Sequence, residues 1–219
     1  MTKAENQANV KFSYKKYYSF RNRINTKFSG RFYSDMQIEN VMRALLYGDT
    51  QPAMVISTEP LLIAAYSDEM DAVIMLRFPS DLVEKYELTP GARLTTSSVY
   101  FSGERVAADI FVGEHYLRRW VDFMPIVQLF LGKGDEKIRA KTALFGEDVW
   151  SRVAEMAEAY CCEHPDLFRD GFYYFKKYTN RGLSCVTAPL FFILRQPTHP
   201  DDRHIRTAQI LPCPWQGHN

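Results

Sequence analysis

Apolar residues recur with a helical spacing in two stretches of the chain. Residues 34–49, SDMQIENVMRALLYGD, carry one apolar stripe at this spacing, and Gly48 supplies a left-handed stop after it. In residues 146–165 the apolar side chains again fall on one side, and charged side chains fall on the other. The pattern predicts helices over residues 35–47 and 146–163.

Shorter apolar runs, bounded by turn residues, predict strands. Runs of this length are typical of strands that are buried on at least one face. A loop of three residues that contains Gly103 joins two of these runs and predicts a hairpin. The predicted strands are residues 53–58, 61–66, 71–78, 92–101, 105–112, 185–195 and 204–211.

The segment 114–131 returns to a helical spacing but contains Pro125. Proline removes a backbone donor and clashes with the preceding turn, so two helical pieces are expected there. A shorter helix is predicted after Pro79, over residues 80–88.

Together these elements predict an α+β fold. We expect a mostly antiparallel sheet of five to seven strands, with about three main helices packed on one face at residues 35–47, 114–131 and 146–163. The chain of 219 residues is long enough to bury a sizeable core. We expect residues 35–219 to form a single α+β domain, preceded by a basic, aromatic-rich segment at residues 1–34.

Composition narrows the class of protein. Apolar residues make up 46% and charged residues 24% of the chain, the usual mixture for a globular protein that folds by itself. The apolar run PLLIAAY at residues 60–66 is far shorter than the ~20 residues that cross a bilayer, so no membrane partner is expected. The amino terminus, MTKAENQANVKF, lacks the apolar core of a secretory signal, which makes the cytoplasm the expected compartment.

Positive charge gathers at the start of the chain. Residues 1–34 hold eight Lys or Arg and one Glu, a charge of +7, so the remaining chain carries −6 of the net +1. The same segment contains KFSYKKYYSFRNR at residues 11–23. This asymmetry indicates either a polyanion partner or an arm that docks on the protein's own acidic surface.

If residues 12–20 form a strand, the alternation of its side chains puts Phe12, Tyr14, Tyr18 and Phe20 on one face and Tyr17 on the other. The lysines of this strand would then contact a nucleic-acid backbone, and the exposed ring of Tyr17 would stack on a base. A second basic stretch around Tyr178 would extend this binding surface. The alternative is a solvated edge strand or arm. The predicted nucleic-acid-binding residues are Lys15, Lys16, Tyr17, Arg21, Arg23, Lys176, Lys177, Tyr178 and Arg181.

Other candidate chemistry is weaker. The segment GKGDEKIRAK at residues 132–141 lacks both the glycine spacing and the hydroxyl of a Walker A loop. The cysteines and histidines lack the paired short spacings of a structural zinc site, so neither a metal nor a cofactor is predicted. The carboxylates Asp68, Glu69 and Asp71 are able to share a proton or hold magnesium, but their place between two strands favours a polar hairpin loop.

These patterns favour a non-enzymatic, cytoplasmic binding or regulatory module whose basic, aromatic surface contacts nucleic acid or another polyanion. The first alternative is a protein-interaction scaffold that forms homo-oligomers through an aromatic-rich sheet. The second alternative is an enzyme of unknown reaction that uses Cys185, His199 and His204.

Overall fold

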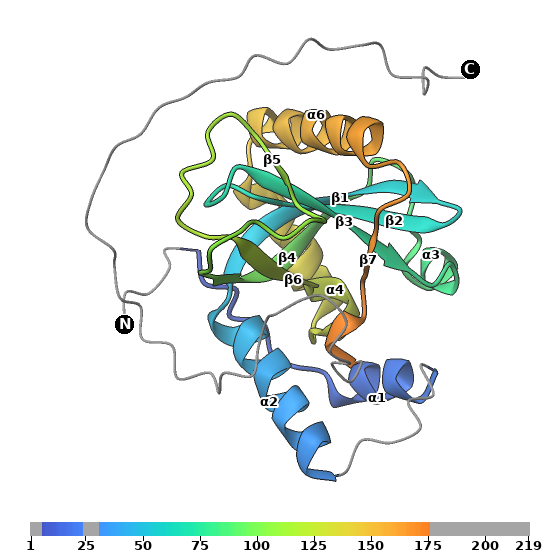
Figure 1. The fold of residues 1–219 in the computed structure, drawn as a ribbon. Coiled ribbons are helices and arrows are strands. Elements are labelled where there is room, and N and C mark those ends of the chain that lie inside the picture. Colours follow the sequence, from blue (N-terminus) through green and yellow to red (C-terminus); the bar gives the residue numbers. More distant parts are fainter. Residues whose placement is uncertain (1–5, 24–30, 176–219) are drawn as a thin grey trace.

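The computed structural model describes residues 6–23 and 31–175 and shows an α+β fold, as predicted (Figure 1). The helices of this part of the chain are α1 (Tyr14–Arg23), α2 (Arg31–Tyr47), α3 (Asp81–Tyr86), α4 (Gln128–Leu131), α5 (Asp135–Ala140) and α6 (Glu147–Glu163), with 3-10 turns η1 (Lys141–Leu144) and η2 (Tyr173–Phe175). The strands are β1 (Asp49–Thr58), β2 (Leu61–Ser67), β3 (Ala72–Phe78), β4 (Arg93–Phe101), β5 (Phe111–Val112), β6 (Asp122–Val127) and β7 (Arg169–Asp170).

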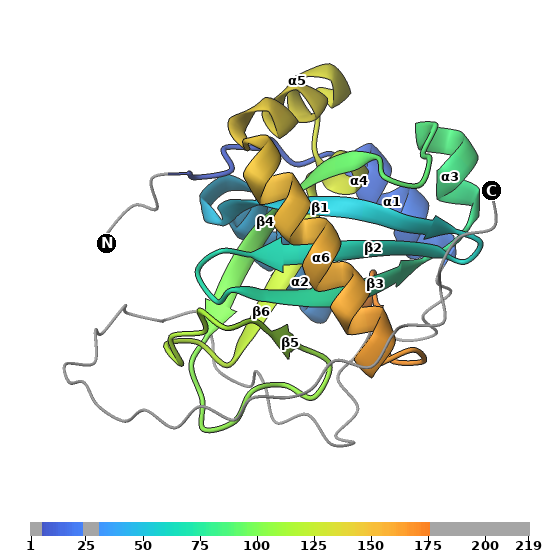
Figure 2. The same cartoon turned by 90° about the horizontal axis from the view of Figure 1, so that it is seen from above.

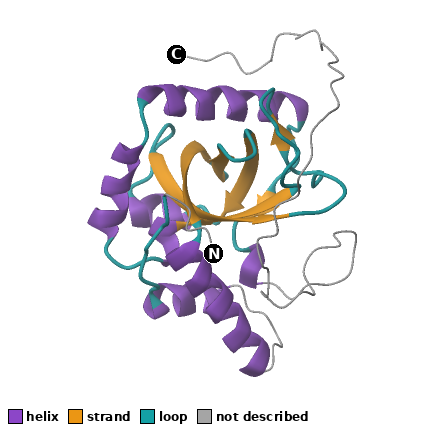
Figure 3. Cartoon of the chain, turned by 90° about the vertical axis from the view of Figure 1, so that its left-hand side faces the viewer, coloured by secondary structure: helices purple, strands orange, loops and turns teal. Residues whose placement is uncertain are grey.

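Within the described residues the strands form one seven-stranded sheet. Its order is β5-β3-β2-β1-β4-β6, and β7 lies beside β3 off this path. The first three strands form an antiparallel meander, in which Ala53 faces Ala65 and Ile63 faces Leu76. The pairing of β3 with β7 is parallel. The predicted sheet of five to seven mostly antiparallel strands is therefore confirmed, and Figure 3 shows that it is curled.

The helices lie on both faces of the sheet, so the predicted packing of three main helices on one face is wrong. Helix α6 runs across β1, β2 and β3 on one face (Figure 2), whereas α1, α2 and α4 lie on the other (Figure 1). Every residue of β2 is buried. Ile63 and Ala65 point into the core beneath α1, α2 and α4, while Ala64 and Tyr66 join Trp150 of α6. Strands that are apolar on both faces need cover on both faces.

The helices expected at residues 35–47 and 146–163 are confirmed as α2 and α6, and the short helix after Pro79 is confirmed as α3. Gly48 ends α2, but it does not adopt a left-handed conformation. Its N–H donates to the carbonyl of Ala44 at 2.8 Å, and an added Cβ would lie 2.4 Å from that oxygen. A close backbone approach therefore requires glycine here.

The segment 114–131 contains a strand where helical pieces were predicted. Strand β6 pairs antiparallel with β4, placing Pro125 opposite Ser98, and only α4 at its end is helical in this stretch. Strand β6 is the last strand in the sheet order and therefore an edge strand. Proline is tolerated in edge strands because no strand lies on their outer side to accept a backbone N–H.

The hairpin predicted from residues 92–101 and 105–112 is also wrong. Strand β4 pairs with β1 and β6, whereas the short β5 pairs with β3. The strands expected at residues 185–195 and 204–211 lie outside the described residues.

The stretch considered as a strand or an arm, residues 12–20, lies largely in helix α1 (Tyr14–Arg23). Ser13 caps it: its carbonyl accepts the N–H of Tyr17 at 3.0 Å, and its Oγ accepts the N–H of Lys16 at 3.4 Å. Phe20 is 1% exposed and lies in the same core as Leu45 of α2. The proposed division of the chain at residue 34 stays a prediction.

Candidate functional site

The helical period of α1 divides the predicted binding residues between its two sides. Lys15 is exposed and Arg21 is partly exposed. Tyr17 and Lys16 face inward, and Arg23 is the last residue of the helix. The remaining members of the predicted site lie outside the described residues: Lys176, Lys177, Tyr178 and Arg181.

Two of these predicted residues have roles inside the fold. The Tyr17 side chain is 0% exposed and its ring lies 5.4 Å from that of Phe12, so it is not available to stack on a base. The Lys16 ammonium donates to the carbonyl of Leu129 and to Oδ1 of Asp135, both at 2.7 Å. Lys16 therefore links α1 to α4 and to the start of α5 through these two hydrogen bonds.

Tyr14 and Tyr18 face solvent instead. They are 47% and 43% exposed, and their rings stack with centroids 6.4 Å apart and planes 23° apart. A strand period places both rings on the buried side, whereas a helical period of four residues places them together on the outer side. Ser13, a residue type that commonly caps a helix, was the signal in the sequence that could have indicated a helix here and hence the exposed position of both rings.

Exposed lysines occur on α1 and in the segment that leads into it. The N–H of Lys133 donates to the carbonyl of Lys11 at 2.7 Å, so these two lysines are opposite each other in a short antiparallel pairing. Like charges placed in this way repel each other. Among the described residues, no acid pairs with Lys11, Lys15 or Lys133. We name Lys11, Tyr14, Lys15, Tyr18 and Lys133 the basic–aromatic face.

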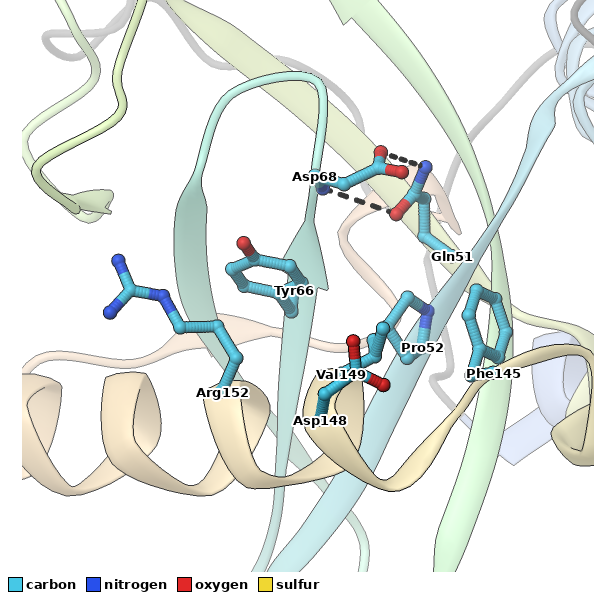
Figure 4. Close-up of a pocket in the computed structure, with 8 residues that line it drawn as sticks. All are labelled: Gln51, Pro52, Tyr66, Asp68, Phe145, Asp148, Val149 and Arg152. Atoms are coloured by element: carbon cyan, nitrogen blue, oxygen red, sulfur yellow. Dashed lines mark hydrogen bonds between the residues drawn. The ribbon is translucent and has the colours of Figure 1, made fainter.

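A cavity of about 240 Å³ lies between the start of α6 and strands β1 and β2 (Figure 4). Strand β1 supplies the polar side chain of Gln51 and the apolar ring of Pro52, and β2 supplies Tyr66. The first turns of α6 close the other side. The lining residues are Gln51, Pro52, Tyr66, Asp68, Phe145, Asp148, Val149 and Arg152.

An ion pair between the buried Asp71 and the partly exposed Arg152 stands at one side of the cavity. Arg152 donates from Nη2 to Oδ2 of Asp71 at 2.8 Å and from Nε to Oδ1 at 3.2 Å. Asp71 also accepts the hydroxyl of Tyr66 at 2.8 Å and the N–H of His115 at 2.9 Å. Burial by itself would raise the pKa of Asp71, but these donors outweigh it and lower that pKa. Burial, and then the neighbouring Asp71, raise the pKa of Tyr66.

A second polar network joins β1 to the turn between β2 and β3. Gln51 Nε2 donates to Oδ2 of Asp49 and Oδ1 of Asp68, both at 2.5 Å, and Gln51 Oε1 accepts the N–H of Asp68 (Figure 4). Tyr100 donates its hydroxyl to Asp49 at 3.2 Å. Burial raises the pKa of Asp49, the hydrogen bond from Gln51 opposes this, and the charge of Asp68 adds to it.

The raised pKa of Asp49 predicts a pH effect on stability. A carboxyl whose pKa is higher in the folded protein favours folding at acidic pH, and this contribution is lost as pH rises through the folded pKa. Asp49→Asn removes the ionisation and keeps an acceptor for Gln51. We expect the free energy of unfolding of the variant, minus that of the wild type, to increase from about pH 4 to pH 7 in urea unfolding. A difference that decreases over this range contradicts the assignment.

The carboxylates considered from the sequence have separate environments. Asp71 is 3% exposed and bound to Arg152, whereas Asp68 and Glu69 are exposed in the turn between β2 and β3. No group of three His, Cys, Asp or Glu among residues 6–23 and 31–175 is arranged to hold a metal ion. Residues Cys185, His199 and His204 of the enzyme hypothesis lie outside the described residues.

Comparison with known proteins assigns no relative. The chain matches no family model, no curated protein and no solved structure. In the described part of the chain, no helix combines the length and the apolar character needed to span a bilayer. The functional argument therefore depends on the geometry of the basic–aromatic face and of the cavity.

Proposed function

We propose that this protein is a non-enzymatic binding module that contacts single-stranded nucleic acid, or another polyanion, through the basic–aromatic face. The observation that carries the proposal is the stacked pair of exposed rings, Tyr14 and Tyr18, beside exposed Lys15. Large aromatic side chains are usually buried in a core, as Tyr17 and Phe20 are on the same helix. Rings that stay in solvent next to cations suit a ligand with flat bases and a charged backbone.

The two kinds of residue would act on different parts of the ligand. The ammonium groups of Lys11, Lys15 and Lys133 would lie along the phosphates and release the counterions condensed there. The rings of Tyr14 and Tyr18 would stack on bases, which every base sequence allows because every base has a flat face. Weak sequence preference and strong dependence on salt are the expected properties.

The lysines are tested by the salt dependence of binding. We expect the full chain to bind a fluorescent oligo(dT) and to bind it less tightly as KCl increases. For single strands, the logarithm of the binding constant falls by about 0.7 per phosphate contact for each tenfold rise in salt. The triple change of Lys11, Lys15 and Lys133 to Ser should therefore reduce this slope by about 2. Fluorescence anisotropy across a KCl series measures it.

Arg105→Ser is a control that removes one exposed cation outside the basic–aromatic face. Arg105 is exposed in the loop between β4 and β5, which lies away from α1 in Figures 1 and 2. This variant should keep the wild-type slope. A triple lysine variant that binds oligo(dT) with an unchanged slope refutes the proposal. Sedimentation velocity without oligonucleotide distinguishes the scaffold alternative, which predicts an oligomer that grows with protein concentration.

A further inference from the structure

The cavity of Figure 4 combines aromatic walls with carboxylates. Tyr66 and Phe145 lie on opposite sides of it, and Pro52 and Val149 lie between them. Asp68 stands at one edge and Asp148 at the other. The ring of Phe145 packs against Trp150 at 5.7 Å, which holds that wall in position.

The charge around the cavity is not balanced. The guanidinium of Arg152 is occupied by Asp71, and Arg119 lies 3.6 Å from Glu69. Within the described residues, no donor bonds the carboxylate of Asp148, and Asp68 keeps Oδ2 open while Gln51 and the N–H of Glu69 occupy its Oδ1. Asp68 and Asp148 thus line the cavity without an ion-pair partner in the described part of the chain.

We propose that this cavity binds a guanidinium group, carried either by a small organic cation or by an arginine side chain of a partner. A guanidinium is planar and delocalised, so it stacks on aromatic rings and donates paired hydrogen bonds to carboxylates. The volume of about 240 Å³ is below the ~300–1,000 Å³ of pockets that enclose drug-sized ligands, which suits one such group on a short stem. The site is separate from the basic–aromatic face and opposite to it in charge.

Isothermal titration calorimetry with two ligands of one shape tests the proposal. Butylguanidinium carries the charge, and butylurea is its neutral counterpart. We expect saturable binding of butylguanidinium to the full chain, at least tenfold stronger than that of butylurea. Asp148→Asn and Phe145→Leu should each weaken the binding. Because no hydrogen bond to Asp148 is present among the described residues, Asp148→Asn should fold as the wild type does.

Asp166→Asn serves as the matched control, because it removes one exposed carboxylate between α6 and β7, outside this cavity. It should bind butylguanidinium as the wild type does. Equal affinity for butylguanidinium and butylurea overturns the proposal, as does the absence of binding by either. Unchanged affinity in the double variant Asp68→Asn, Asp148→Asn also overturns it.

A further titration distinguishes the two sources of the group. An acetylated arginine amide that binds more tightly than butylguanidinium assigns the site to a partner's side chain, and weaker binding assigns it to a small molecule. This comparison is made only after binding of butylguanidinium has been established. The triple lysine variant of the basic–aromatic face should keep this binding, so failure of the polyanion proposal leaves the cavity proposal testable.

Discussion

Tyr17→Ala should lower the free energy of unfolding by about 3–5 kcal/mol, the range for truncating a large aromatic side chain in a core. Tyr17 is 0% exposed and packs against Phe12. The same change at Tyr18, which is 43% exposed, should shift stability by only about 0.5 kcal/mol, as surface changes usually do. Urea unfolding followed by far-UV circular dichroism measures both.

This pair of neighbouring tyrosines tests which side of α1 faces the core. A strand over residues 12–20 gives the reverse order, because it buries Tyr18 and exposes Tyr17. Equal losses at the two positions would contradict the helix, since a helix of this orientation cannot bury both rings. Tyr18→Phe is the conservative control and should unfold at the wild-type urea concentration.

Arg152→Met should also destabilise the fold, by about 1–3 kcal/mol, the usual cost of leaving a buried acceptor without one of its donors. The cost stays below that of breaking a fully buried pair because Arg152 is 28% exposed. The side chain of Asp71 is 4% exposed and would keep its charge without the guanidinium that binds it. Adding Asp71→Asn to this variant should recover part of the loss, because the amide carries no charge to bury. Thermal and urea unfolding of the single and double variants measure the recovery.

The loss caused by Arg152→Met should depend on pH. In the wild type the pKa of Asp71 is lowered, so this group stabilises the fold above its unfolded pKa, and the contribution is lost as pH falls through the folded pKa. Without Arg152 the pKa of Asp71 rises relative to the wild type, because the guanidinium no longer lowers it. The destabilisation should therefore shrink as pH falls below about 4, where Asp71 becomes protonated in the wild type as well. A loss that grows in acid would contradict the assigned role of Asp71.

Local patterns predicted the elements whose structure depends mainly on neighbours in sequence. Helices α2 and α6 follow from apolar spacing, and β1 to β3 follow from short apolar runs between turns. Strand β6 was missed because it depends on pairing with β4, about 25 positions away, as in Val99 opposite Met124. Its apolar residues fit a helical spacing as well as a strand.

The candidate sites show the same limit. In KFSYKKYYSFRNR the aromatic residues fit either period, and the strand that was considered exchanges the inner and outer rings of Tyr17 and Tyr18. The ion pair between Asp71 and Arg152 joins positions 81 residues apart, so no local pattern indicates it. The sequence suggested polar chemistry near Asp68, but only the packing of α6 on the sheet creates a cavity beside it.

The most direct test of the binding function compares the affinity of oligo(dT) for Tyr14→Ala, Tyr18→Ala and Tyr47→Ala. Tyr47 is 56% exposed at the end of α2 and lies outside the basic–aromatic face, which makes it the matched control. Base stacking contributes about 1–3 kcal/mol per base, so Tyr14→Ala and Tyr18→Ala should each weaken binding by about 5- to 150-fold. Tyr47→Ala should bind as the wild type does. Equal affinity of all three variants and the wild type in fluorescence anisotropy would contradict a nucleic-acid surface on α1.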